Sequence, residues 1–293
     1  MANLQWKIGD VTVTKIVALE TALPEGMLVP EATTAALEPY RSWLAPNFMT
    51  SDSQLRVSFH ALVVQTPTCR IVVDTCVGEH RIPGMGGLFA GAKSLPDALA
   101  ENDTPRESID YVMCTHLHFD HVGWNTMQVD GRWVPTFENA RYIFAREEWE
   151  HWSSVEENHF AINFNDAVRP VVDAGLTELV DTDHQLCDEV RLVPTHGHSP
   201  GHVSVLIESG GQQALITGDS AHHPVQFAEP DWGVPADSDT VAAAATRRSM
   251  LAEYGDRDVL VIGTHFAGCT AGHLVQTDEG WQFRPHDGGT DAA

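Results

Sequence analysis

Apolar residues recur along the chain in short alternating or continuous runs, the pattern of β-strands. Alternation predicts a strand over residues 11–19. Two apolar runs, at 55–65 and 70–75, predict a hairpin that turns at Pro67-Thr68. Further strands are predicted at 109–114, 190–193, 203–208, 214–217 and 259–262.

Two stretches carry helical signals instead. Residues 95–102 indicate a short helix. Asp237-Ser238-Asp239 is an N-cap cluster for a helix over 240–254, which Gly255 ends. Because strands alternate with helices and strand ends repeatedly carry His or Asp, we expect one layered α/β domain over residues 1–293.

Residues 125–175 differ in character from the rest of the chain. Asp130-Gly131 predicts a tight hairpin turn, and Glu147 and Glu148 open a predicted helix. The stretch is also rich in tryptophan and phenylalanine. We expect it to be a Trp-rich insertion that covers the active site.

Composition narrows the range of partners. The 293 residues include 41 acidic and 17 basic ones, for a formal net charge of −24, and such a surface repels phosphate backbones, so we expect no nucleic-acid partner. No apolar run is long enough to span a bilayer and the N-terminal residues lack the pattern of a secretory signal, so we expect no membrane association. Five scattered cysteines without a Cys-x-x-Cys pair indicate free thiols in a reducing compartment, which predicts a cytoplasmic protein.

The chain is unusual in its 16 histidines, which cluster. The densest cluster is Thr115-His116-Leu117-His118-Phe119-Asp120-His121, directly after the predicted strand at 109–114. Imidazole and carboxylate are ligands that a borderline cation such as Zn²⁺ selects. In an extended segment His116 and His118 point the same way, while Asp120 and His121, on the next turn, can face a second ion.

Three later segments repeat this arrangement of a ligand residue after a predicted strand, beside a glycine that permits a tight turn. They contain His198, Asp219 and His265, which follow the runs at 190–193, 214–217 and 259–262. A single histidine after a strand is more often structural than ligating. Four such segments together indicate a metal site.

The pattern His-x-His-x-Asp-His, followed by a His, an Asp and a final His, resembles the metallo-β-lactamase superfamily, and the resemblance runs from the Asp74 region to His265. It implies a four-layer αββα sandwich that binds two divalent cations, with Zn²⁺ favoured over Mn²⁺, Fe²⁺ or Co²⁺. It also implies the ligands: His116, His118 and His198 for one cation, Asp120, His121 and His265 for the other, and Asp219 bridging both.

In such a centre, two cations lower the pKa of bound water from about 15.7 towards 7 and provide a bridging hydroxide for hydrolysis. Asp120 is then expected to pass a proton to the leaving group. His222 stands where the best-known lactonases of this family have a tyrosine, so it either donates to the developing oxyanion or packs behind the site. Asp74 is expected to orient a metal-binding histidine through its other ring nitrogen.

The resemblance is strongest to the branch containing N-acyl homoserine lactonases and methyl parathion hydrolase, which implies hydrolysis of a small-molecule lactone or ester. Two alternatives stay open: a phosphotriester or xenobiotic hydrolase with the same site, and a noncatalytic binding protein on the same fold. His202 is expected to be a structural hydrogen-bonding partner. Five tryptophans are candidates for an apolar pocket, for core packing or for a homodimer contact: Trp124, Trp133, Trp149, Trp152 and Trp232.

Overall fold

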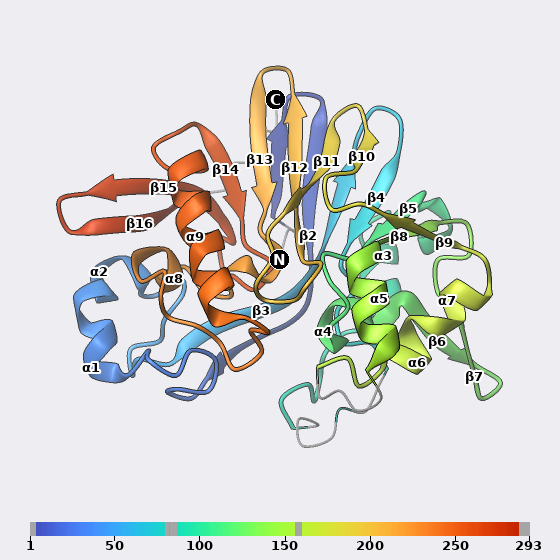
Figure 1. The fold of residues 1–293 in the computed structure, drawn as a ribbon, viewed down its shortest axis with the longest axis horizontal. Coiled ribbons are helices and arrows are strands. Elements are labelled where there is room, and N and C mark those ends of the chain that lie inside the picture. The colour runs from blue at the N-terminus through green and yellow to red at the C-terminus, as the bar shows by residue number, and fades with distance from the viewer. Residues whose placement is uncertain (1–3, 80–81, 83–86, 156–159, 287–293) are drawn as a thin grey trace. The chain divides into compact units, whose positions relative to one another are not determined.

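The computed structural model describes residues 4–79, 82, 87–155 and 160–286 (Figure 1). The chain divides into two compact units: unit 1 comprises Met1–Leu19 and Phe59–His184, and unit 2 comprises Glu20–Ser58 and Gln185–Ala293. The expectation of one domain over residues 1–293 stays a prediction. Within the described ranges, no helix is both long and apolar enough to cross a membrane.

Unit 1 is built on a seven-stranded sheet with the order β1-β2-β3-β4-β5-β8-β9. β3 and β4 form the predicted antiparallel hairpin, with Leu62 opposite Val73, whereas β4, β5, β8 and β9 run parallel. Residues 20–23 of β2 and 55–58 of β3 are counted with unit 2. The strands are β1 Gln5–Ile8, β2 Val11–Leu23, β3 Leu55–Gln65, β4 Arg70–Val73, β5 Tyr111–Met113, β8 Arg141–Ala145 and β9 Thr177–Val180.

Short helices pack on the sheet of unit 1. Ser94 caps the first of them by accepting a hydrogen bond from the Asp97 amide, and Leu95 and Leu99 of this helix join the buried core with Val72 and Val112. The helices are α3 Leu95–Ala100, α4 Phe119–Val122, α5 Arg146–Ser154, α6 Phe164–Ala167 and α7 Arg169–Asp173.

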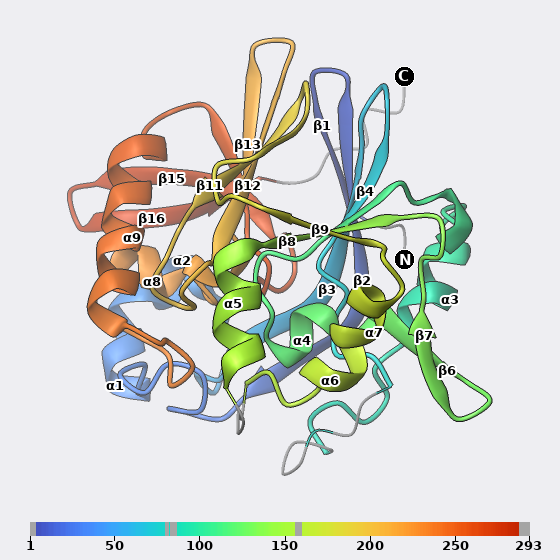
Figure 2. The same ribbon diagram turned by 45° about the vertical axis from the view of Figure 1, so that its right-hand side comes forward.

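The predicted hairpin at Asp130-Gly131 is present. β6 (Thr126–Val129) pairs with β7 (Arg132–Pro135), and both turn residues have positive φ, 51° and 74°, as a type I′ turn requires. The hairpin forms its own two-stranded sheet beside α7 (Figure 2). The 125–175 stretch also contains β8, a member of the main sheet, and its residues 156–159 lie outside the described residues. Its role as an insertion over the active site stays a prediction.

Unit 2 has a second seven-stranded sheet, in the order β10-β11-β12-β13-β14-β15-β16. All neighbours are antiparallel except β13 and β14. The strands are β10 Gln185–Cys187, β11 Val190–Pro194, β12 Val203–Ser209, β13 Gln212–Ile216, β14 Val259–Ile262, β15 Ala271–Thr277 and β16 Gly280–Pro285. The four predicted strands of this unit match β11 to β14.

The long helix α9 (Thr240–Tyr254) has the predicted limits. The Asp239 side chain accepts hydrogen bonds from the amides of residues 241 and 242, and Gly255 follows the last turn. The helix lies beside β14 to β16 (Figure 1), and its Met250 and Leu251 pack into the same core as Val259 and Phe283. The other helices of unit 2 are α1 Thr34–Leu37, α2 Arg41–Leu44 and α8 Val225–Ala228. The mixed α/β fold class is confirmed.

Candidate functional site

In unit 1, the histidine-rich segment begins directly after the parallel strand β5. His116 and His118 lie in the connection to α4, and Asp120 and His121 occupy that helix. The ring centroid of His116 is 4.4 Å from that of His118 and 4.0 Å from that of His121, and all three rings are buried. His121 Nε2 is 3.7 Å from Asp120 Oδ1. The structure therefore brings together the four predicted ligands of this unit.

Asp74 anchors this group from the end of β4. Its Oδ2 accepts a hydrogen bond from His121 Nδ1 at 3.0 Å and from the Thr115 hydroxyl at 2.9 Å, and its Oδ1 accepts from the Thr115 amide at 2.8 Å. Thr115 Oγ1 is in turn 3.1 Å from His116 Nδ1. The predicted contact of Asp74 with a histidine ring is thus present, and Thr115 extends it to a second ring.

Glu148 of α5 is a contributor that sequence reasoning missed. Its side chain is buried, and its Oε2 accepts hydrogen bonds from the Leu117 amide at 3.1 Å and from Trp152 Nε1 at 2.6 Å. The Trp152 ring lies 5.3 Å from that of His118. Glu148 therefore holds the backbone between the two candidate ligands His116 and His118. The two partners are 31 residues apart in sequence, so no local pattern predicts this contact.

Unit 2 carries the other predicted ligands on turns that follow its strands. His198 lies between β11 and β12, Asp219 lies in the turn Gly218–Ser220 after β13, and His265 follows β14. His198 Nε2 is 3.5 Å from Asp219 Oδ2, and His265 Nε2 is 3.2 Å from Asp219 Oδ1. Each oxygen of the carboxylate therefore faces a predicted histidine ligand.

The His198 turn depends on Gly197, whose φ is +127°. A Cβ atom there would lie 2.2 Å from the Ala243 backbone nitrogen of α9, so this position accepts only glycine. The close approach fixes His198 against the N-terminal end of the helix.

His222 belongs to the same cluster as the unit 2 ligands. Its Nε2 is 3.0 Å from Asp219 Oδ2, and its ring stacks on that of His265 with an interplanar angle of 3°. The ligand atoms of His198, Asp219 and His222 all lie within 4.8 Å of one another. His222 is thus placed to contact whatever the Asp219 carboxylate binds.

Four candidate histidines share one feature: Nδ1 is held by an oxygen. The acceptors are Asp74 Oδ2 for His121 (3.0 Å), Thr115 Oγ1 for His116 (3.1 Å), Asp237 Oδ1 for His198 (2.9 Å) and the Ser58 carbonyl for His265 (3.2 Å). Carboxylates and carbonyls only accept, and the Thr115 hydroxyl donates its own proton to Asp74, so Nδ1 carries the proton in each histidine and Nε2 keeps its lone pair for a cation. These residues therefore fit divalent cations of the zinc type.

The neighbouring histidines are explained by hydrogen bonding. His202 accepts the Asp219 amide at Nε2 (2.8 Å) and contacts Thr195 through Nδ1, which confirms the predicted structural role. His196 Nδ1 contacts the Pro200 carbonyl. His223 Nε2 donates to the Phe48 carbonyl at 2.8 Å, and burial lowers the pKa of His223 to about 4, so this ring is neutral near pH 7.

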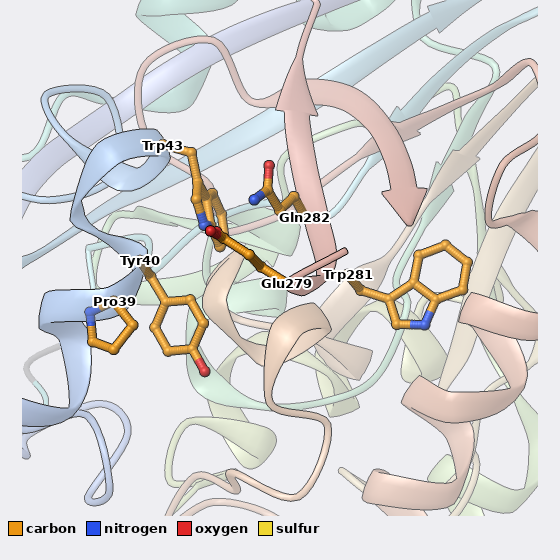
Figure 3. Close-up of a pocket in the computed structure, with 6 residues that line it drawn as sticks. All are labelled: Pro39, Tyr40, Trp43, Glu279, Trp281 and Gln282. Carbon is orange, nitrogen blue, oxygen red and sulfur yellow. The ribbon is translucent and has the colours of Figure 1, made fainter. Parts of the chain in front are cut away.

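A separate cavity of about 310 Å³ lies in unit 2. Figure 3 shows residues of the 39–43 segment on one side and of the β15–β16 hairpin on the other, and none of the predicted site residues lines it. Its lining is Pro39, Tyr40, Trp43, Glu279, Trp281 and Gln282. Trp232, one of the five tryptophans considered for a substrate pocket, packs edge-on against Tyr40.

Comparison with known proteins gives the family. Residues 60–265 match the family model described as the metallo-beta-lactamase superfamily. N-acyl homoserine lactonase of Bacillus cereus is 27% identical over 192 residues, which cover 61% of this chain and 70% of the relative. A probable metallo-hydrolase of Mycobacterium tuberculosis, Rv2300c, is 25% identical over 187 residues, which cover 56% of this chain and 57% of the relative.

Solved structures agree at the level of fold. The hydrolase AbOPH, of the beta lactamase superfamily, aligns with a TM-score of 0.79, 21% identity and 97% coverage of both chains. AidC, a dizinc quorum-quenching lactonase in complex with a product, aligns with a TM-score of 0.76, 20% identity and 97% coverage of both chains. The fold expected from the sequence is confirmed. The chain belongs to the metallo-β-lactamase superfamily and is a metal-dependent hydrolase.

Proposed function

We propose that this hydrolase opens lactones, or cleaves simple esters, of small uncharged molecules, with N-acyl homoserine lactones as the first substrates to test. The observation that carries the proposal is the placement of the Asp219 carboxylate between the Nε2 atoms of His198 and His265. Named lactonases among the relatives, which are 26% to 27% identical, support the choice of substrate class.

We assign the cation ligands from the family pattern together with the geometry inside each unit. All of them fall within the matched range 60–265. One cation would be held by His116, His118 and His198, the other by Asp120, His121 and His265, with Asp219 shared between them. When bound, two divalent cations supply a nucleophile at neutral pH and polarise the scissile carbonyl.

The protein's own groups would complete the reaction. The Asp120 side chain is 14% exposed, against 4% for Asp219, so Asp120 is the carboxylate that can exchange a proton with the leaving oxygen and with solvent. His222 Nε2 lies 3.0 Å from Asp219 Oδ2, and if that carboxylate holds a cation, His222 would be placed to donate to the oxyanion that develops on the substrate.

The net charge of the protein favours an uncharged substrate. The formal charge of −24 repels polyanions at long range, so a neutral substrate approaches more readily. Trp152 is buried beside His118 in the core of unit 1, and the edge of its ring would border an acyl group bound near that candidate ligand.

The test is a substrate panel with zinc-reconstituted protein. We expect turnover of N-hexanoyl and N-decanoyl homoserine lactone, and loss of that turnover in Asp219→Asn but not in the exposed control Asp188→Asn. Faster turnover of a phosphotriester such as paraoxon would favour the phosphotriesterase alternative. No hydrolysis of lactones, esters or phosphotriesters by fully loaded protein would favour a noncatalytic binding protein.

A further inference from the structure

Helix α9 contains a fully buried arginine, Arg247, whose side chain is 0% exposed. Its Nε donates to the Pro230 carbonyl at 2.8 Å, and its Nη1 donates to the Ser220 carbonyl at 3.3 Å. Nη1 also lies 3.9 Å from Asp237 Oδ2, and the Asp237 side chain is 0% exposed as well. Withdrawing a guanidinium from water is unfavourable unless its charge and its donors are matched, so this position is not explained by packing alone.

Two of the groups that Arg247 contacts, Asp237 and Ser220, are next to candidate metal ligands within unit 2. Asp237 Oδ1 accepts a hydrogen bond from His198 Nδ1 at 2.9 Å, so the carboxylate that faces Arg247 also sets the orientation of the His198 ring. Ser220, whose carbonyl accepts from Arg247, directly follows Asp219 in the turn after β13. One guanidinium therefore contacts the supports of two ligands.

Resting on the proposed function, we propose that Arg247 is a positioning residue: it holds the Asp237 carboxylate behind His198 and the turn that carries Asp219, so that both ligands are aligned before a cation binds. The role requires the forked geometry of arginine, because two donors in different directions serve two main-chain carbonyls while the positive charge faces Asp237.

The charges around the guanidinium support this role. Burial lowers the pKa of Arg247, while the Asp237 carboxylate, and more weakly Asp231, oppose that shift. The same oxygen that faces Arg247, Asp237 Oδ2, also accepts a hydrogen bond from the Val234 amide at 3.2 Å. The carboxylate behind His198 thus has one hydrogen-bond donor on each oxygen and a buried positive charge beside Oδ2.

Arg248 provides a matched control. It is the next residue on α9, its side chain is 51% exposed, and it pairs with Asp231 at the surface. Arg247→Met and Arg247→Lys are compared with Arg248→Met by titrating the metal-free proteins with Zn²⁺ against a chromogenic chelator. We expect Arg247→Met to weaken zinc binding by about 10-fold to 100-fold, Arg247→Lys to weaken it less, and Arg248→Met to leave it unchanged.

A second readout needs neither zinc nor activity. Long-range ¹H–¹⁵N NMR of the metal-free protein reports which nitrogen of His198 carries the proton. We expect a single Nδ1–H tautomer in the wild type and in Arg248→Met, and a mixture in Arg247→Met. If Arg247→Met does not fold, Arg247→Lys and Asp237→Asn are compared in a double-mutant cycle, where the two losses in zinc affinity should not multiply.

A merely structural role makes a different prediction: Arg247→Met would melt at a lower temperature but keep wild-type zinc affinity and the His198 tautomer. That result would overturn the inference. A wild-type protein that binds zinc but hydrolyses no panel substrate would instead contradict the proposed function alone. An NMR difference confined to Arg247 variants would support the positioning role even then.

Discussion

Replacing Asp74 by Asn tests how one carboxylate controls a candidate ligand. Asp74 accepts three hydrogen bonds, from the Thr115 amide and hydroxyl and from His121 Nδ1, at 2.8, 2.9 and 3.0 Å. Its φ is +58°, which Asn tolerates about as readily as Asp, so the backbone should not change. An amide has one accepting oxygen, and when that oxygen keeps the Thr115 amide, the NH₂ group faces His121.

The size of the effect follows from this geometry. His121 must either lose its partner or move its proton to Nε2, the atom assigned to the cation. A hydrogen bond to a charged group contributes about 1.5–3 kcal/mol. At about 1.4 kcal/mol per factor of ten, Asp74→Asn should weaken zinc binding about 10-fold to 100-fold.

The assay is zinc competition with a chromogenic chelator, on metal-free protein. Asp110→Asn is the control, because Asp110 Oδ2 also accepts a backbone amide, that of Arg70, at 2.8 Å, but in an exposed position that touches no candidate ligand. The control should keep wild-type affinity. Wild-type zinc affinity in Asp74→Asn would refute the idea that this carboxylate fixes the His121 tautomer for metal binding.

Four further outcomes are expected. Asp219→Ala should lose most bound zinc and nearly all activity, and unchanged zinc content by elemental analysis would contradict a shared ligand. His222→Ala should keep its zinc and lower kcat about 100-fold, and a wild-type rate would assign His222 to packing. Gly197→Ala should lower the free energy of unfolding, measured in urea, by more than about 3 kcal/mol, because the added Cβ would meet the α9 backbone. Gly211 has a φ of +79° but lies in open space, so Gly211→Ala should lower the free energy of unfolding by only about 1 kcal/mol. Burial lowers the pKa of His223 to about 4, whereas histidine in the unfolded chain titrates near 6.5, so below pH 6.5 the unfolded state binds more protons than the folded state. The free energy of unfolding should therefore fall by up to about 3 kcal/mol as the pH is lowered from 6.5 to 4. His223→Gln should remove this pH dependence.

The parts of the fold predicted correctly are those with an unambiguous local signal. Helix α9 has an Asp cap and a terminal glycine, and β11 to β14 are continuous apolar runs next to turn residues. β15 and β16 were missed because their sequences mix small, polar and aromatic residues, and their burial follows from pairing with each other and with β14. β8 was missed because its short apolar segment begins with an arginine inside a stretch interpreted as an insertion.

The candidate ligands were visible in the sequence because their types and order are distinctive, but their supports were not. The local sequence places Asp237 in an N-cap cluster, whereas in the structure Asp239 is the cap and Asp237 faces His198. Glu148 lies in the first turn of α5, as its sequence predicts, and its side chain also accepts a hydrogen bond from the Leu117 amide. Such roles depend on contacts between residues far apart in sequence, and no local pattern encodes them.

The different acceptors behind the imidazoles have a consequence for metal exchange. In the proposed assignment, each cation has one histidine backed by a carboxylate, His198 by Asp237 and His121 by Asp74. A negative charge behind an imidazole makes the ring a stronger electron donor than a neutral oxygen does. Each position thus has one strong anchor, so the two ions should leave at similar rates during dialysis, and a stable half-loaded enzyme should not accumulate.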